Sequence, residues 1–223
     1  PETDADGNVV QSSTYNDAQA ISTLTKYAAM YGFDANTGIE IDETAPHVST
    51  ADGARTAMGQ AGNTFTTSQL SRYAATIANN GTCYDLTLVD KIKDVDGKTV
   101  LNNSAKVRNK VNVAQSTWQA VHNGMYRVVN GAEHGSIFAG MKKKFAGKTG
   151  TAQQNTLHPN HAYFLSYGPY ENPEISVSCV IPNGYTSSYA MECARDVYQY
   201  YFGDKKVSGG KATSVGHYAR TND

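Results

Sequence analysis

The 223-residue chain lacks the features that mark several large classes of protein. No apolar run approaches the roughly 20 residues that a transmembrane helix needs, so the sequence predicts no membrane span. The net charge is −1, without the basic excess that is typical of nucleic-acid binding, so we expect no nucleic-acid partner. No signal peptide opens the chain, which starts at "PETDADGNVV" without an initiator Met. This start suggests a piece of something longer.

Cysteine is also scarce. Cys83, Cys179 and Cys193 are widely spaced, odd in number and without a CxxC pair, which excludes a zinc ribbon or a disulfide framework. Small buried thiols are the simplest interpretation. Cys179 and Cys193 can still approach one another if the strand and the helix that hold them pack together.

The remaining candidates for metal or charge chemistry are few. His158 and His161 follow each other at a spacing of three in a loop without a third ligand, so we predict no metal site and no cofactor. We expect these two histidines to form a turn near a cleft, and His134 to be exposed. The lysine run 142–144 is interpreted as a solvated face close enough to that cleft to favour anionic ligands.

Helical periodicity is clear in four stretches. A first helix is predicted from Asp17 to Gly32, and the clearest one begins at Thr66 or Thr67 and ends before Gly81. Their apolar residues follow the helical repeat: Ile21, Leu24, Ala28 and Tyr31 in the first, and Leu70, Tyr73, Ala74 and Ile77 in the second. A third covers 115–130, with Trp118, Val121, Met125 and Val128 inward. A fourth covers 188–202, with Met191, Ala194, Val197, Tyr198 and Tyr201 available for packing. Residues 34–64 are expected to be long and irregular.

Strand patterns fill the rest. Residues 86–95 and 98–102 read as a hairpin that turns at Asp96-Gly97. The last third holds three strand candidates, "KKFAGKTGTAQ", "HAYFLSYGPY" and "EISVSCVIP". Helices followed by an antiparallel meander and a closing helix predict an α+β fold, an antiparallel sheet with packed helices.

The stretch "FAGKTGTAQQ" carries the chemistry. If it is an edge strand, its unpaired N–H and C=O groups can pair with a peptide substrate. Gly150 has no side chain to block that approach, and Gly147 relieves crowding behind it. Lys148 supplies a positive charge for a terminal carboxylate, and the hydroxyls of Thr149 and Thr151 can hydrogen-bond the same group. The backbone N–H of Thr151 can form half of an oxyanion hole.

Several segments in order resemble one family. The string Lys-Thr-Gly-Thr-Ala-Gln, residues 148–153, resembles the third active-site motif of the class B penicillin-binding proteins. Residues 27–41 and 58–82 resemble the Phe-Gly…Thr-Gly-Ile and Gly-Gln segments of that transpeptidase domain, with a Thr where the family usually has Pro. The helix "VHNGMYRVVN" also falls in its usual place. The resemblance covers about residues 20–202 and implies the penicillin-binding protein transpeptidase or serine β-lactamase-like fold.

The resemblance implies a substrate and a site. The substrate is the D-Ala-D-Ala end of a peptidoglycan stem peptide, which β-lactams mimic. Lys148 and Thr151 are the implied catalytic residues, and the implied substrate-binding residues are Thr149, Gly150, Thr151, Ala152 and Gln153. The resemblance also implies cell-wall synthesis partners, and a location at the outer face of the bacterial cytoplasmic membrane through an upstream anchor.

The nucleophile of the family is missing here. Its serine lies in Ser-x-x-Lys at a helix start, where the lysine activates it. That pattern occurs once, at Ser208–Lys211 in a Gly-rich tail, and Ser-x-Asn, the second motif, does not occur. We therefore expect residues 1–202 to be the C-terminal part of one transpeptidase domain and residues 203–223 to be a disordered tail. An upstream segment of the same protein would supply the nucleophile and the first strands of the sheet, so the chain alone would be inactive.

Three functions compete at this point. The first is a D,D-transpeptidase that works through a serine acyl-enzyme. The second is a related serine β-lactamase or β-lactam sensor, which shares the Lys-Thr-Gly strand. The third is a non-catalytic domain that only binds peptidoglycan or a partner.

Overall fold

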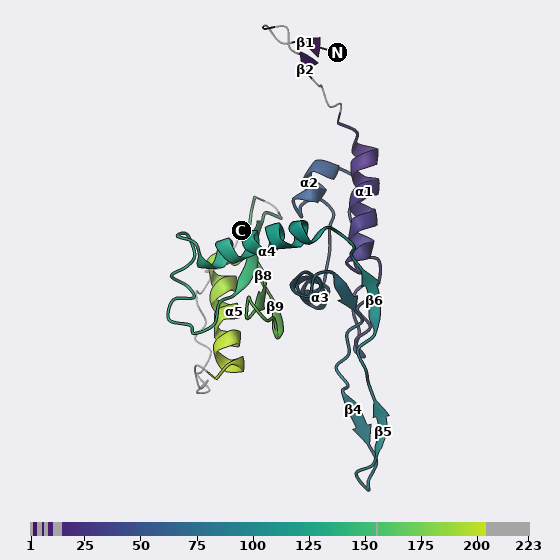
Figure 1. Ribbon diagram of the computed structural model, residues 1–223. Coiled ribbons are helices and arrows are strands. Elements are labelled where there is room, and N and C mark those ends of the chain that lie inside the picture. The colour runs from purple at the N-terminus through teal and green to yellow at the C-terminus, as the bar shows by residue number, and fades with distance from the viewer. Residues whose placement is uncertain (1, 4–5, 7–8, 11–14, 155, 204–223) are drawn as a thin grey trace, which may run out of the picture.

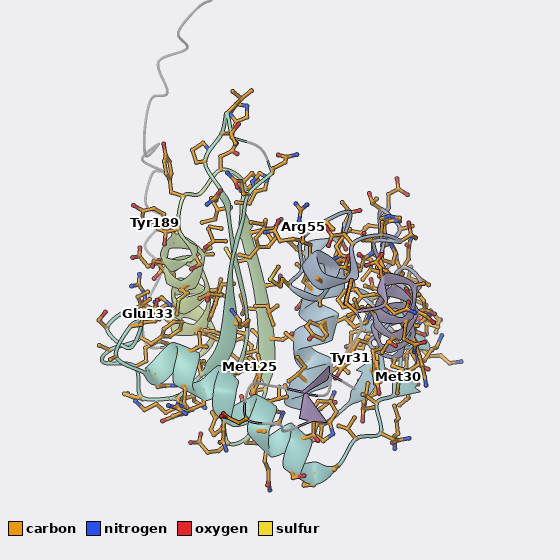
Figure 2. The ribbon with its side chains drawn as sticks, turned by 90° about the horizontal axis from the view of Figure 1, so that it is seen from above. Met30, Tyr31, Arg55, Met125, Glu133 and Tyr189 are labelled. Carbon is orange, nitrogen blue, oxygen red and sulfur yellow. The ribbon has the colours of Figure 1, made fainter. Side chains whose placement is uncertain are left out.

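The computed structural model describes residues 2–3, 6, 9–10, 15–154 and 156–203. Its centre is a three-stranded antiparallel sheet of β7 (Ala146–Ala152), β8 (His161–Gly168) and β9 (Ile175–Ile181), in the order β7-β8-β9. Helix α5 (Ser187–Tyr201) covers one face and α3 (Thr67–Ala78) covers the other, so that the two helices enclose the sheet (Figure 2). The predicted α+β fold and its three late strands are confirmed.

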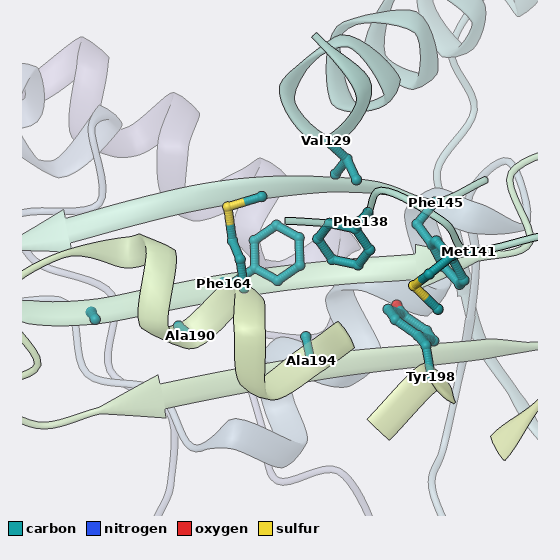
Figure 3. Close-up of a cluster of buried hydrophobic side chains, with 10 residues drawn as sticks. Val129, Phe138, Met141, Phe145, Phe164, Ala190, Ala194 and Tyr198 are labelled. Atoms are coloured by element: carbon teal, nitrogen blue, oxygen red, sulfur yellow. The ribbon is translucent and has the colours of Figure 1, made fainter. Parts of the chain in front are cut away.

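The two faces of the sheet follow from strand alternation. On β9, Ile175, Val177, Cys179 and Ile181 pack against the cluster under α5, whereas the Ser176 hydroxyl donates to the Ser71 carbonyl of α3 at 3.1 Å. Figure 3 shows the buried cluster, in which Phe164 of β8 faces α5. The Phe145 and Tyr198 rings lie 4.2 Å apart there. Burial of these aromatic side chains fixes the distance between α5 and the sheet.

Helix α3 begins as the sequence predicts. Thr66 accepts from the Gln69 N–H, and the Gln69 side chain accepts from the Thr66 N–H, which completes a capping box. The predicted apolar stripe is only part of the buried face, because Gln69 and Arg72 are also buried. The Arg72 guanidinium donates to the carbonyls of Gly32, Ala35 and Asn36, and this ties α3 to the segment that follows α1.

The N-terminal helix differs in detail from the prediction. Helix α1 (Asp17–Met30) is capped by Asn16 and not by Asp17, and it contains no buried residue. Asp17 instead accepts from the Gly53 N–H at 2.6 Å and so holds α2 (Gly53–Ala57) beside α1. Before them, β1 (Glu2–Thr3) pairs with β2 (Val9–Val10). Figure 1 shows α1 on the side of α3 away from the sheet and α2 above α3.

The segment 34–64 is less irregular than predicted, because it contains α2 and a bridge between His47 and Thr64. Glu43 anchors it to the start of α3. Its carboxylate accepts from the Thr37 N–H at 2.6 Å, from the Thr66 hydroxyl at 3.0 Å and from Ser68. Although burial opposes ionisation, these hydrogen bonds lower the pKa of Glu43.

The predicted hairpin is shorter than its sequence pattern. Strands β4 (Lys91–Lys93) and β5 (Thr99–Asn102) pair across the Asp96-Gly97 turn, and Val95 at the tip is fully exposed. Residues 86–90 are not a strand, because the Glu40 carboxylate accepts from the Thr87 hydroxyl and from the Leu88 N–H. A pair that the sequence did not reveal, β3 (Thr82–Tyr84) and β6 (Val107–Lys110), joins this hairpin to the body (Figure 1).

The predicted buried faces of two helices are partly wrong. Helix α4 (Gln115–Asn130) buries Trp118 and Met125 as predicted, but Val121 is 39% exposed and Val129, not Val128, is fully buried. In α5, Ala190, Met191, Ala194 and Tyr198 are buried, whereas Val197 is 40% exposed and Tyr201 is 50% exposed. The inward face of each helix is therefore rotated by about one residue from the sequence estimate.

In the described residues, no helix is long and apolar enough to cross a membrane. Of the predicted tail 203–223, all but Gly203 lies outside the described residues. The assignment of residues 1–202 to one part of a larger domain stays a prediction.

Candidate active site

Strand β7 is an edge strand, as the sequence argument required. In the described part of the chain it pairs with β8 alone, through a register from Ala146↔Tyr167 to Ala152↔His161. Lys148 is exposed, and its Nζ donates to the Thr149 carbonyl at 2.6 Å. The ammonium group therefore lies at the open margin of the sheet and not inside a sealed core.

Both glycines of the strand pack closely against β8, and Gly147 does so more tightly than Gly150. A Cβ at Gly147 would lie 2.5 Å from a Phe164 ring carbon and 2.9 Å from the Leu165 carbonyl oxygen. At Gly150 it would lie 3.1 Å from the Tyr163 Cβ. Gly147 therefore relieves crowding, as predicted, and Gly150 has a packing reason as well as the predicted role of admitting a ligand.

Register divides the predicted site between two faces. Lys148 and Gly150 lie opposite Leu165 and Tyr163, whereas Thr149 and Thr151 lie opposite Phe164 and Ala162, on the α5 side. Residues that alternate along a strand point to opposite faces. A ligand carboxylate could therefore contact Lys148 and one of the threonine hydroxyls at the same time only at the open edge of β7, between the two faces of the sheet.

A hollow of 490 Å³ adjoins this edge. Lys148 and Thr149 line it from β7, and Arg127 and His134 line it from the C-terminal end of α4 and the loop after it. His134 was expected to be exposed, but its side chain is only 13% exposed and lies 3.6 Å from Glu133, which Figure 2 labels beyond the end of α4. Because its basic side chains outnumber its one acid, the hollow suits an anionic ligand.

The sequence argument missed Arg127 and the residues that hold β7 in place. The Asn130 side-chain amide donates to the Tyr126 carbonyl and, at 2.8 Å, to the Phe145 carbonyl. The Tyr170 N–H donates to the Lys144 carbonyl at 2.8 Å. These contacts fix the segment that leads into Lys148. Only the position of "VHNGMYRVVN" before the strand hinted at them.

The lysine run before β7 is not a free cationic patch. Lys143 lies 3.5 Å from the Glu174 carboxylate and 4.4 Å from the centre of the Phe202 ring. Its charge is therefore partly satisfied by groups outside the hollow.

At the other end of β7, the histidine pair does not form a metal site. His161 begins β8, where its Nδ1 accepts from the Asn183 N–H at 2.9 Å and its Nε2 lies 3.1 Å from the Gln154 side-chain oxygen. In the described residues, no three His, Cys, Asp or Glu side chains are grouped to hold a metal ion. Ala152 ends the strand half-buried, and Gln153 follows it exposed.

The described residues that line the hollow do not include the serine nucleophile of the family. In the described part of the chain, neither serine nor cysteine lines it. The sequence Ser208–Lys211 lies outside the described residues. The described lining of the hollow therefore contains no serine or cysteine that could form an acyl-enzyme.

The fold and the edge site define a member of the penicillin-binding enzymes. The family model of the penicillin binding protein transpeptidase domain matches residues 8–199, and the chain belongs to this family. The resemblance to the class B enzymes is thereby confirmed.

Three relatives make the comparison specific. The chain is 32% identical over 207 residues to penicillin-binding protein 2B of Streptococcus pneumoniae, which covers 84% of this chain and 30% of the relative. The solved structure of that protein from strain R6 superposes with a TM-score of 0.73, at 28% identity, over 87% of this chain and 36% of that one.

The peptidoglycan D,D-transpeptidase MrdA of Haemophilus influenzae is 29% identical over 219 residues, or 83% of this chain and 33% of the relative. A solved complex of penicillin-binding protein PBP2 and MreC from Helicobacter pylori aligns at 25% identity with a TM-score of 0.65, over 83% of this chain and 36% of that one. The chain spans about a third of the length of the curated relatives that it matches.

Proposed function

We propose that the intact protein is a peptidoglycan D,D-transpeptidase that works through a serine acyl-enzyme, and that this chain supplies the substrate-binding edge of its site. One observation carries the proposal: Lys148 is exposed on an unpaired strand edge, within the Lys-Thr-Gly-Thr-Ala-Gln string of a family member. The H. influenzae relative is named as a D,D-transpeptidase, which supports this reaction.

The edge geometry suggests how the chain takes part. A stem peptide that ends in D-Ala-D-Ala lies alongside β7 and hydrogen-bonds to its free backbone groups. Lys148 and Thr149 hold the terminal carboxylate at the edge, and Arg127 adds positive potential from the same hollow. The Thr151 N–H donates to the oxygen that becomes negative in the tetrahedral intermediate. Gly150, Ala152 and Gln153 form the rest of the binding strand.

An upstream segment of the same protein completes the fold in this proposal. Strand β9 pairs only with β8 in the described residues, so its outer edge has no strand partner. Beside it is a second hollow of 550 Å³, lined in part by Ile39, Ile41, Leu86, Leu88, Val177 and Val197. Additional strands and helices from upstream would cover this apolar surface and bring the nucleophilic serine opposite Lys148.

The location and the partners are part of the same proposal. A transpeptidase that acts on peptidoglycan works at the outer face of the cytoplasmic membrane, and we propose that an upstream anchor holds it there. The H. pylori relative was solved with MreC, which supports an interaction of the intact protein with other cell-wall synthesis proteins.

The two alternatives predict different behaviour toward β-lactams. A serine β-lactamase releases hydrolysed antibiotic rapidly, whereas a transpeptidase keeps it as a long-lived acyl adduct. A non-catalytic binding domain forms no covalent adduct at all.

The test is therefore the lifetime of the adduct. We expect the intact protein to form a stoichiometric benzylpenicillin adduct, visible as a mass increase and lost over minutes to hours, and to release D-Ala from a D-Ala-D-Ala-terminated donor peptide. Multiple turnovers of the antibiotic per minute would favour the β-lactamase. The absence of any adduct would favour the binding domain and contradict the proposal.

A further inference from the structure

Cys179 and Cys193 come from different elements and lie close together at one side of the sheet. Cys179 is in β9, and the alternation of that strand places it with Ile175, Val177 and Ile181 on the face that α5 covers. Helix α5, which carries Cys193, packs against both β8 and β9. The sequence alone did not decide whether Cys179 and Cys193 are close together, and the packing of α5 on β9 places them so.

Helix α5 places Cys193 on the side that faces β9. Val197 lines the hollow beside Ile175 and Val177, so this flank of α5 faces β9. Cys193 lies one turn before Val197 on the same flank, because residues four apart share a helix face. The Cys193 thiol lies near enough to the Cys179 thiol to raise its pKa.

The three cysteines differ in accessibility. Cys193 is exposed and Cys179 is half-buried, whereas Cys83 is fully buried and its thiol donates to the Tyr31 carbonyl at 3.6 Å. In this chain taken alone, a small oxidant in solution can therefore reach Cys193 directly and cannot reach Cys83. The prediction of small buried thiols is correct for Cys83 and wrong for Cys193.

We propose that Cys179 and Cys193 are an oxidation site, at which a small-molecule disulfide such as oxidised glutathione converts the two thiols to an intramolecular disulfide between β9 and α5. This inference goes beyond the proposed function, and the thiol geometry does not depend on it. Only the oxidising environment in which such bonds persist rests on the extracytoplasmic location in that proposal.

The reaction proceeds by two thiol–disulfide exchanges. The thiolate of Cys193 attacks one sulfur of oxidised glutathione and expels a glutathione thiolate, which leaves a mixed disulfide on Cys193. Cys179 then loses its proton to water and attacks the Cys193 Sγ, which expels the second glutathione thiolate. Two protein thiols are oxidised, and one glutathione disulfide is reduced to two thiols.

The rate of the second exchange depends strongly on pH. Burial, together with the contact with Cys193, raises the pKa of the Cys179 thiol, so little thiolate is present near neutral pH. Below that pKa, each unit of pH increases the thiolate fraction about tenfold, and the closing rate rises with it. The charged residues of α5 near Cys193 in sequence are Glu192, Arg195 and Asp196. Arg195 forms an ion pair with Asp196 at 2.9 Å.

The test compares the intact protein in oxidised glutathione and in dithiothreitol. We expect alkylation and peptide mapping to show a linked Cys179–Cys193 peptide and an alkylatable Cys83 after unfolding. The bond closes a loop of about 15 residues, so the oxidised form should melt roughly 3–10 °C higher. Cys193→Ser, at an exposed helical position, should abolish both the linked peptide and the shift while the reduced protein melts as before.

Three results of the peptide mapping would overturn the proposal. They are free Cys179 and Cys193 after oxidation, a mixed disulfide that persists on Cys193 without closing, or a Cys193 bond between two copies of the chain. A melting shift that survives Cys193→Ser would also contradict it, because the shift would then have another origin.

Discussion

Lys148→Ala in the intact protein is expected to slow acylation by a β-lactam about 100- to 1,000-fold while the fold survives. The side chain is exposed, and its Nζ donates to the adjacent Thr149 carbonyl, so its loss removes little packing. It does remove the cation that holds the ligand carboxylate and stabilises developing negative charge, and loss of one such preorganised group typically costs about 2.7–4 kcal/mol of transition-state stabilisation. The measurement is the second-order acylation rate with a fluorescent penicillin, beside a melting curve.

Lys142→Ala is the matched control. It removes the same charge from an exposed position six residues earlier, outside the hollow beside β7. Acylation by this variant should remain within about twofold of the parent, because salt largely screens an exposed charge that lies outside the hollow. Equal rates for the parent and Lys148→Ala would remove Lys148 from the site.

Gly147→Ala is expected to have the largest effect on the fold. The new methyl group would lie 2.5 Å from the Phe164 ring, which is only 1% exposed, and 2.9 Å from the backbone oxygen of Leu165. Neither atom can move freely, so overpacking should cost about 1–3 kcal/mol of stability. Thermal unfolding of the intact protein measures the loss. Acylation should fall as well, since the distortion is transmitted directly to Lys148.

Two other glycines provide the controls. Gly124 is in α4 with no atom within 4 Å of the added methyl group, so Gly124→Ala should stabilise the protein by up to about 1 kcal/mol. Gly150→Ala meets only the Tyr163 Cβ at 3.1 Å and should destabilise less than Gly147→Ala. If Gly147→Ala melted with the parent, the packing explanation of this strand would be incorrect.

The sequence predicted those parts of the fold that local patterns determine. The helix start at Thr66, the Asp96-Gly97 turn and the three late strands all depend on residues close together in the chain, and all are present. The edge position of the Lys-Thr-Gly strand was a condition of the sequence argument, and the described pairing of β7 with β8 meets it. Helix faces were displaced because α4 and α5 orient by contacts with distant strands, which periodicity alone does not specify.

The features that the sequence did not reveal depend on contacts between segments that are far apart in the chain. Arg72 reads as a surface residue of a helix, but it is buried because three carbonyls from the segment 32–36 converge on it. The β3–β6 pair joins segments that are separated by the whole hairpin. His134 lies in a Gly-flanked stretch that looks exposed, and only the position of α4 against β7 encloses it. The roles of Thr149, Thr151, Ala152 and Gln153 in binding remain predictions.

The most direct measurement labels the intact protein and the 223-residue chain with a fluorescent penicillin and maps the labelled peptide by mass spectrometry. If β7 binds the ligand for a serine supplied by the upstream segment, the intact protein carries the label on a serine outside residues 1–223, and the chain alone carries none. A label on any residue of this chain, in either sample, would contradict that division of the site.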